Sequence, residues 1–328
     1  MKKTEYLLIA LIFVSSMTIS SSTNAVAQQT PTNNFNTINY PSATNTFALG
    51  INNAGQIVGY YYNSQENYHG FLLSSGNYTS INYPGASSTT VLGINNAGQI
   101  VGYYYDNSGH LHGFLLSSGN YTSIDYPGEN STSAFGINNA GQIVGNYIDS
   151  SEHFHGFLLA SGNYTSIDYP GENSTAPYGI NNAGQIVGNY IDSVGHYHGF
   201  LLASGNYTPI DYPGENSTAP YGINNAGQIV GYYYNNLENN HGFLLLSGNY
   251  TSIDYPGANS TAAFGINNAG QIVGSYYDDS GHYHGFLLSS GETIQTTPEF
   301  GPVAPIILGI SILSIIILSV RTRFLHRS

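Results

Sequence analysis

The chain has 328 residues, of which only 7% are charged, and it contains no cysteine. Disulfide bonds are therefore excluded, and stability must come from packing and hydrogen bonding. The five basic residues all lie near the two ends, at Lys2, Lys3, Arg321, Arg323 and Arg327. A body without lysine or arginine has no groups to neutralise a phosphate backbone, which excludes nucleic acid as a partner.

The first 27 residues have the composition of a secretory signal peptide. Two lysines precede an apolar run from Leu7 to Val14, and a stretch rich in serine and threonine leads to Ala25-Val26-Ala27. This order matches the basic, apolar and small-residue parts of an export signal, so cleavage after Ala27 is predicted. Residues 1–27 are thus interpreted as a signal peptide and residues 28–34 as a short linker.

A segment with the sequence GINNAGQIVG occurs six times at a constant spacing of 43 residues. Within each period the apolar pattern breaks at turn signals into four short runs, which predict four strands, for example 131–137, 142–148, 155–159 and 164–169. Four strands of this size make one β-propeller blade. Residues 35–291 are therefore predicted to form an all-β, six-bladed β-propeller of four-stranded blades. The segments begin at Gly50, Gly93, Gly136, Gly179, Gly222 and Gly265.

The ends of the repeat array indicate how the ring closes. Residues 35–41 have the pattern of a fourth strand, whereas the last repeat lacks a fourth strand in register. We expect the N-terminal strand to complete the last blade, because an open ring would leave a sheet edge unpaired. If the ring closes in this way, the first strand of each blade is the innermost one. Pro177 and Pro220 are expected on that strand, facing the central channel, where a missing N–H breaks no ladder hydrogen bond.

Each repeat also carries a His-Gly-Phe sequence downstream of GINNAGQIVG. The pair resembles the HAF family of extracellular repeats, whose pattern is a GIN-AGQ-VG segment followed by His-Ala-Phe. The resemblance covers about residues 35–291 and implies a secreted repeat protein, with no known chemistry. Glycine stands here in place of the alanine of that family, at Gly70, Gly113, Gly156, Gly199, Gly242 and Gly285.

The C-terminal part has three segments. Residues 292–301 form a linker ending in Pro298-Glu299-Phe300-Gly301, residues 302–320 are uncharged and mostly apolar, and residues 321–328 form a basic tail. The apolar segment is long enough for a transmembrane helix, and the arginines after it place the tail in the cytoplasm and the repeats outside. The order resembles the PEFG-CTERM sorting signals of archaeal surface proteins. This resemblance implies recognition by an archaeosortase-type processing enzyme, with an ordinary permanent membrane anchor as the alternative.

The six histidines of the His-Gly-Phe sequences are candidates for catalysis or metal binding, and four have a second histidine two residues earlier on the same strand face. Zinc needs three or four ligands, and separate blades keep these pairs apart. We therefore expect structural histidines that bond backbone within their own blade. They are His69, His112, His155, His198, His241 and His284, and the earlier partners are His110, His153, His196 and His282.

One aromatic position is tyrosine in all six repeats. We expect these side chains to pack between blades, and a sugar-stacking platform is the alternative. The residues are Tyr61, Tyr104, Tyr147, Tyr190, Tyr233 and Tyr276.

Acidic residues are predicted to gather on one face of the ring, in the loops that follow second and fourth strands. Weak calcium binding is one hypothesis for this face, because clustered carboxylates without lysine or arginine attract cations. A solvated acidic surface is the alternative. No other cofactor is expected. The candidate ligands are Asp106, Asp149, Asp192, Asp278 and Asp279.

Nine Asn-x-Ser/Thr sequences are candidate N-glycosylation sites in an exported body. Alternatively, copying an asparagine- and threonine-rich unit six times multiplies a chance sequence. The residues are Asn77, Asn120, Asn130, Asn163, Asn173, Asn206, Asn216, Asn249 and Asn259.

The chain lacks cysteine, its body lacks lysine and arginine, and no serine stands in a nucleophile elbow, so nucleophilic catalysis is not expected. Near identity of the repeats also argues against an asymmetric active site, and no enzyme is predicted. The sequence predicts an exported propeller, anchored to the cell surface, that acts as a structural, adhesive or ligand-binding module for a surface glycan or protein. The alternative is an extracellular hydrolase or lyase acting on surface polysaccharide.

Overall fold

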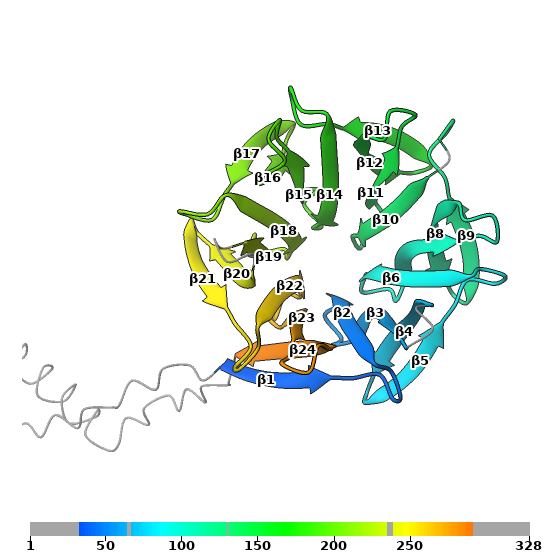
Figure 1. Ribbon diagram of the computed structural model, residues 1–328. Helices are drawn as coiled ribbons and strands as arrows, with labels where there is room; N and C mark the ends of the chain where they lie inside the picture. Colours follow the sequence, from blue (N-terminus) through cyan, green and yellow to red (C-terminus); the bar gives the residue numbers. More distant parts are fainter. Residues whose placement is uncertain (1–32, 64–66, 130, 235–238, 291–328) are drawn as a thin grey trace, which may run out of the picture.

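A computed structural model describes residues 33–63, 67–129, 131–234 and 239–290. They form six antiparallel sheets of four strands, arranged radially around a central axis (Figure 1). The predicted all-β, six-bladed β-propeller is therefore confirmed. No helix with the length and hydropathy of a membrane span occurs in these ranges. The predicted signal peptide, sorting motif, transmembrane helix and basic tail lie outside them.

Five blades are built from consecutive strands, the first strand of each lying nearest the axis. The first is β2 (Asn45–Ile51), β3 (Ile57–Tyr62), β4 (His69–Ser74) and β5 (Asn77–Ile81), and the second is β6 (Ser88–Ile94), β7 (Ile100–Tyr105), β8 (Leu111–Ser117) and β9 (Asn120–Ile124). The third is β10 (Thr132–Ile137), β11 (Ile143–Ile148), β12 (Phe154–Ala160) and β13 (Asn163–Ile167). The fourth is β14 (Ser174–Ile180), β15 (Ile186–Ile191), β16 (Tyr197–Ala203) and β17 (Asn206–Ile210). The fifth is β18 (Ser217–Ile223), β19 (Ile229–Tyr234), β20 (Asn240–Leu246) and β21 (Asn249–Ile253).

The sixth blade joins the two ends of the array. It contains β22 (Ser260–Ile266), β23 (Ile272–Tyr277) and β24 (Tyr283–Ser290), and its outer strand is β1 (Asn33–Ile38). Phe35 lies opposite Leu288 and Ile38 opposite Gly285 in the antiparallel ladder. The N-terminal strand thus completes the last blade, as its sequence predicted, and no blade is left with three strands.

Glycine-containing turns set the strand ends. In the first blade, Ser75 and Gly76 have φ of 49° and 78°, as both central residues of a type I′ hairpin turn do. In the third blade, Glu172 N–H donates to the Tyr169 carbonyl oxygen across a Pro-Gly turn. That turn needs Tyr169 outside the ladder, so the fourth strand ends at Ile167, two residues before the predicted end.

The tyrosine found in every repeat packs between blades. Tyr104 stacks on Tyr83, which leads from the first blade into the second, with ring centroids 3.6 Å apart and an interplanar angle of 7°. Its other face lies against His112, with centroids 5.1 Å apart. Tyr104 is 9% exposed beside these two rings, so the predicted packing between blades is confirmed. The equivalent stacks are Tyr40–Tyr61, Tyr126–Tyr147, Tyr169–Tyr190, Tyr212–Tyr233 and Tyr255–Tyr276.

Close contact between blades explains the glycine of His-Gly-Phe. A Cβ on Gly156 would lie 2.5 Å from the Ile167 carbonyl oxygen and 2.6 Å from Cδ of Pro177 in the next blade. Pro177 is buried in this contact, and Pro220 packs in the same way against Gly199. The prediction that these prolines lie on the inner edge strand is confirmed, but their pyrrolidine rings fill the space beside a glycine of the preceding blade instead of pointing into the channel.

Candidate ligand-binding site

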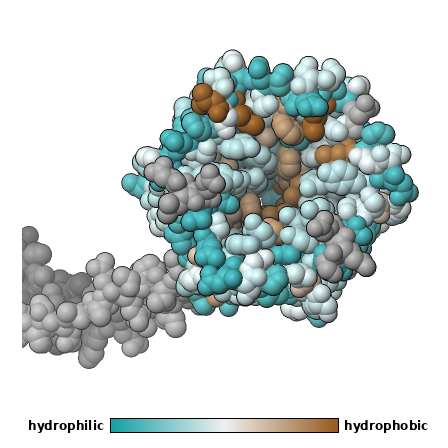
Figure 2. All heavy atoms as spheres, in the orientation of Figure 1, coloured by the Kyte–Doolittle hydropathy of each residue, from teal (hydrophilic) through white to brown (hydrophobic). Residues whose placement is uncertain are grey.

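A cavity of about 620 Å³ lies on the axis of the ring, which we call the funnel. Figure 2 shows the hollow at the centre of one face, with hydrophobic residues on its wall. The inner strands β2, β6, β10, β14, β18 and β22 supply much of this wall. The described residues that line the funnel include no Asp, Glu, His, Lys or Arg. The cavity is therefore uncharged.

A β-bulge directs one side chain per blade into the funnel. In the fourth blade the register between β14 and β15 shifts between Pro177 and Gly179, which leaves Tyr178 unpaired. Bulges bend a strand and change the direction of the unpaired side chain. The same shift occurs in the other blades. The bulge residues are Leu49, Leu92, Phe135, Tyr178, Tyr221 and Phe264, and all six line the cavity.

These six residues make the funnel asymmetric. The first two blades contribute leucines, whereas the other four contribute aromatic rings. Tyr178 and Tyr221 stack with centroids 4.2 Å apart, and Phe264 meets Tyr221 edge-on at 5.1 Å. The repeats are nearly identical, but the residue before the first glycine of GINNAGQIVG differs among them. The sequence argument that regular repeats leave no asymmetric site is therefore incomplete.

The tyrosine hydroxyls of the funnel remain neutral at physiological pH. Burial raises the pKa of Tyr178 to about 12, and burial together with the neighbouring Tyr178 raises the pKa of Tyr221 well above its usual value of 10. Burial likewise raises the pKa of Tyr60 and Tyr232. These groups can therefore offer hydrogen bonds to a ligand without adding a charge.

The funnel narrows toward one face of the ring. The six isoleucines of the GINNAGQIVG segments line both the funnel and a smaller cavity of about 70 Å³ beyond it, which the following asparagines surround. The funnel opens toward the other face, where Phe154 and Tyr283 stand at the starts of third strands. Its mouth thus lies on the face that carries the second-to-third loops.

The mouth of the funnel is on the acidic face. Every Asp and Glu among the described residues follows a second or a fourth strand. Asp106 lies in the loop after a second strand, and Asp125 follows a fourth strand. Both contact His112, so these two kinds of loop meet at the same end of the blade. The predicted acidic face is therefore confirmed for this part of the chain, and a bound anion would meet an unfavourable potential there.

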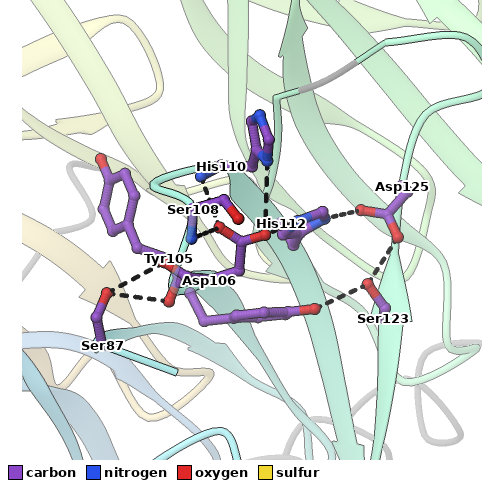
Figure 3. A network of polar contacts seen from close by, with 9 residues as sticks. Ser87, Tyr105, Asp106, Ser108, His110, His112, Ser123 and Asp125 are labelled. Carbon is purple, nitrogen blue, oxygen red and sulfur yellow. Dashed lines mark hydrogen bonds and ion pairs between the residues drawn. The ribbon is translucent and has the colours of Figure 1, made fainter. Parts of the chain in front are cut away.

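Each His-Gly-Phe histidine bonds a side chain rather than the backbone. In the second blade, His112 Nδ1 lies 2.7 Å from Asp125 Oδ1, and His112 Nε2 lies 3.7 Å from Asp106 Oδ2 (Figure 3). Asp125 Oδ2 accepts a hydrogen bond from Ser123 Oγ at 2.7 Å. The expectation of a backbone partner was thus wrong, although the partner does lie in the same blade. In five repeats the partner is an Asp or Asn 13 residues downstream, which was a signal in the sequence, and in the sixth blade Asn39, which follows β1, is the partner of His284.

The order of these contacts does not match a nucleophilic triad. Ser123 donates to Asp125, and Asp125 contacts His112, so the carboxylate stands between the hydroxyl and the imidazole. A serine nucleophile needs the imidazole itself as its base. This cluster therefore supports a structural role that ties the second-to-third loop to the end of the fourth strand.

Four of the candidate calcium ligands accept hydrogen bonds from backbone N–H groups of their own loops. Asp106 Oδ1 accepts N–H groups from Ser108 at 2.8 Å and from His110 at 2.9 Å, which lowers the Asp106 pKa. Asp149, Asp192 and Asp278 make the equivalent turns, and Asp279 is exposed. Among the described residues no three His, Asp or Glu side chains are gathered as a metal site. Weak calcium binding stays a prediction.

The candidate glycosylation sites lie on the surface. Asn77 and its equivalents begin fourth strands and are exposed, with side-chain Nδ2 donating to the carbonyl oxygen of Ser75 in the first blade. Asn173, Asn216 and Asn259 are also exposed, in the links that precede inner strands. Asn130 lies outside the described residues. Glycan occupancy stays a prediction.

Comparison with known proteins identifies the fold and nothing narrower. No protein-family model matches the chain, and a search of curated proteins gives no match. AofleA from Arthrobotrys oligospora is 12% identical over 79% of this chain and 87% of its own, with a TM-score of 0.53. Virginiamycin B lyase from Staphylococcus aureus is 14% identical over 78% and 99%, with a TM-score of 0.47. Aleuria aurantia lectin is 14% identical over 76% and 93%, with a TM-score of 0.49.

Proposed function

We propose that this chain is an exported, cell-surface-anchored propeller that binds an uncharged ligand in the funnel. The observation that carries the proposal is a cavity of about 620 Å³ with aromatic and hydroxyl groups on its wall and no charged group among its described residues. Ligand sites typically combine such an apolar wall with a few polar groups. Four of the six bulge residues on this wall are aromatic, which gives a ligand flat apolar surfaces to stack against.

Binding without catalysis is the form of function that the funnel supports. Hydrolysis or elimination at a sugar needs carboxylates or another acid and base at the reacting bond. The described lining offers only hydroxyls, amides and apolar groups. We therefore propose a ligand-binding or adhesive module rather than the extracellular hydrolase or lyase considered as the alternative.

The proposed location rests on the two ends of the sequence. The export signal ends at Ala27, and the tail carries Pro298-Glu299-Phe300-Gly301 before an apolar segment and a basic end. We propose that the ring is exported, that a sorting enzyme acts at this tail, and that the acidic face with the funnel mouth is available to ligands outside the cell. Mass spectrometry of the mature protein checks this. Retention of residues 321–328 would count against processing and in favour of a plain anchor.

A glycan array probed with the full chain tests the binding function. A double variant, Phe135→Leu with Tyr178→Leu, copies the aliphatic wall that Leu49 and Leu92 already form, so the ring should still close. We expect neutral glycans to bind the original chain at least about tenfold more tightly than the variant, because two aromatic contacts are lost. Equal binding by both proteins would place the ligand elsewhere, and capture of no neutral ligand would contradict the proposal.

A further inference from the structure

The wall of the funnel opens into a side groove at one place. A cavity of about 150 Å³ lies between the third and fourth blades and shares Asn146, Phe154 and Tyr178 with the funnel. Its other walls include Asn189 and Tyr197 of the fourth blade. The groove therefore extends the funnel outward between two blades rather than forming a separate site.

Two substitutions within the repeat create this groove. The second strands of the first, second and fifth blades carry Tyr60, Tyr103 and Tyr232 at the position where the third and fourth blades carry Asn146 and Asn189. In the first blade that tyrosine packs edge-on against Tyr68, with centroids 5.4 Å apart. A carboxamide is smaller than a phenol ring, so the third and fourth blades leave open the space that the ring fills in the first, second and fifth blades. The sixth blade has the small Ser275 at this position, but its neighbours in the ring carry Tyr232 and Tyr60.

The loss of these rings also leaves two aromatic residues without ring partners. Phe154 and Tyr197 occupy the position of Tyr68, and each is 38% exposed. Their ladder partners are Ile148 and Ile191, where the first blade has Tyr62. No described aromatic ring packs against either side chain, whereas Tyr68 contacts Tyr60 and Tyr62. Phe154 and Tyr197 therefore present free ring surface beside the groove.

The groove also holds polar groups that need a partner. Asn146 is only 7% exposed, lines both cavities, and makes no side-chain hydrogen bond to another described residue. A carboxamide that is nine-tenths buried and unbonded is costly unless a ligand or water completes it. Asn189 is 4% exposed and lines the groove together with Tyr178, at the junction with the funnel.

We propose that the funnel ligand is a neutral carbohydrate and that the groove between the third and fourth blades is its principal subsite. This inference rests on the proposed function of the funnel and names its ligand class. The apolar faces of a sugar ring stack on aromatic side chains such as Phe154 and Tyr197, and its hydroxyls both donate to and accept from a carboxamide such as Asn146. A purely apolar ligand would leave that carboxamide unpaired. A cationic ligand would be favoured by carboxylates, and the described residues that line the two cavities include none.

The sequence places this subsite once in the ring. Six similar blades suggest six equivalent sites, but two adjacent blades that both carry asparagine at this position occur once, at Asn146 and Asn189. One carbohydrate chain per ring is the expected stoichiometry.

Calorimetry of the full chain with three neutral trisaccharides, maltotriose, mannotriose and chitotriose, tests the subsite. Phe154→Leu removes one ring and copies Leu111 of the second blade, and Asn146→Tyr fills the groove as Tyr103 does. Tyr68→Leu is the matched control, because Tyr68 is 36% exposed at the equivalent position and lines neither cavity. Thermal melting verifies that each variant is folded.

We expect one site per ring for at least one trisaccharide, a loss of affinity of at least about tenfold in Phe154→Leu and Asn146→Tyr, and no change in Tyr68→Leu. Several equivalent sites, or unchanged affinity in both groove variants, would overturn the subsite and leave the binding function of the funnel intact. Binding of tetramethylammonium in place of all three sugars would overturn both the carbohydrate class and the uncharged ligand of the proposed function. If neither the sugars nor tetramethylammonium binds, this inference fails, and the glycan array decides the proposed function separately.

Discussion

Asn267 donates a hydrogen bond from Nδ2 to the backbone carbonyl oxygen of Asn52 at 3.2 Å, although 215 positions separate the two residues. The same bond joins neighbouring repeats, as from Asn52 to Asn95. The next asparagine of each segment adds a second set, in which Asn268 N–H donates to Asn53 Oδ1 at 3.0 Å. The two asparagines of GINNAGQIVG therefore close two rings of hydrogen bonds around the axis, which explains why both occur in every repeat.

Replacing one buried asparagine of this ring should destabilise the protein strongly. Asn95 is 3% exposed, donates to Gln99 and Asn138, and accepts N–H groups from Ala97 and Gln99. Asn95→Ala leaves buried partners unpaired and should lower the free energy of unfolding by about 2–4 kcal/mol, as measured by urea denaturation. Asn96→Ala is the control, because Asn96 is exposed and accepts one such bond, so a loss of about 1 kcal/mol or less is expected. Equal losses would argue against the buried ring as a stabilising element.

Alanine in place of the His-Gly-Phe glycine should be tolerated in one blade and not in another. Gly156→Ala places a Cβ 2.6 Å from Pro177 and 2.5 Å from a backbone oxygen, so a loss of about 1–3 kcal/mol is expected. At Gly285 the nearest atoms are 3.1 Å away, and the neighbour in the next blade is the small Ala48. Gly285→Ala should therefore cost less than about 1 kcal/mol. Thermal melting of both variants checks the order, and a reversed order would contradict the packing described between blades.

The N-terminal strand should be required for a stable sixth blade. Deleting residues 35–41 removes all of β1 except Asn33 and Asn34. The lost side chains include Ile38, which is 5% exposed, and Phe35, whose ring centroid lies 5.3 Å from that of Phe286. The deletion should lower stability by more than about 3 kcal/mol and expose the edge of β24 to aggregation. Melting and light scattering report the two effects. A truncated protein that melts like the full chain would show that β1 does not secure the ring.

Stability should fall as the pH rises through the titration range of His155. Burial alone would lower the His155 pKa, but contacts with Asp168 at 3.0 Å and Asp149 at 3.3 Å raise it above its usual 6.5. A raised pKa in the folded state means that protonation stabilises the fold. This stabilisation is complete below the unfolded pKa of about 6.5 and is lost as the pH rises through the folded value.

Urea denaturation between about pH 6 and about pH 8 measures this loss. Asp168→Asn is the variant to compare, because Asn82 already stands at the equivalent position opposite His69. The loss of stability should be smaller in Asp168→Asn than in the original chain. Identical pH profiles would show that the contact with Asp168 does not raise the His155 pKa.

The architecture could be predicted from sequence because its signals are regular. The 43-residue period predicted a four-stranded blade. The extra fourth strand at residues 35–41 indicated both the number of blades and the strand that closes the ring. Pro-Gly and Ser-Gly pairs marked turns whose positive φ values the structure contains. Each of these features is a short pattern that can be compared between repeats, so one sequence was enough to find them.

The candidate site could not be predicted from the same signals. The bulge between Pro177 and Gly179 decides that Tyr178 reaches the axis while Pro177 packs on the preceding blade. Strand alternation alone does not reveal a bulge. The change from Tyr103 to Asn146 was visible as a difference between repeats, but only the packing of adjacent blades shows that it opens a groove. The histidine clusters were also missed, although Asp106 and Asp125 lie in the same repeat as His112, because only the folded blade brings the second-to-third loop beside the end of the fourth strand.

The central claim is that one uncharged ligand occupies the funnel and its side groove. Hydrogen–deuterium exchange tests this claim most directly, when the full chain is measured with and without the saccharide that binds most tightly. We expect new protection in β14 (Ser174–Ile180) and at the start of β12, where Phe154 stands, with little change in the first blade. Protection distributed equally over all six blades, or confined to the outer strands such as β13 and β17, would contradict that claim.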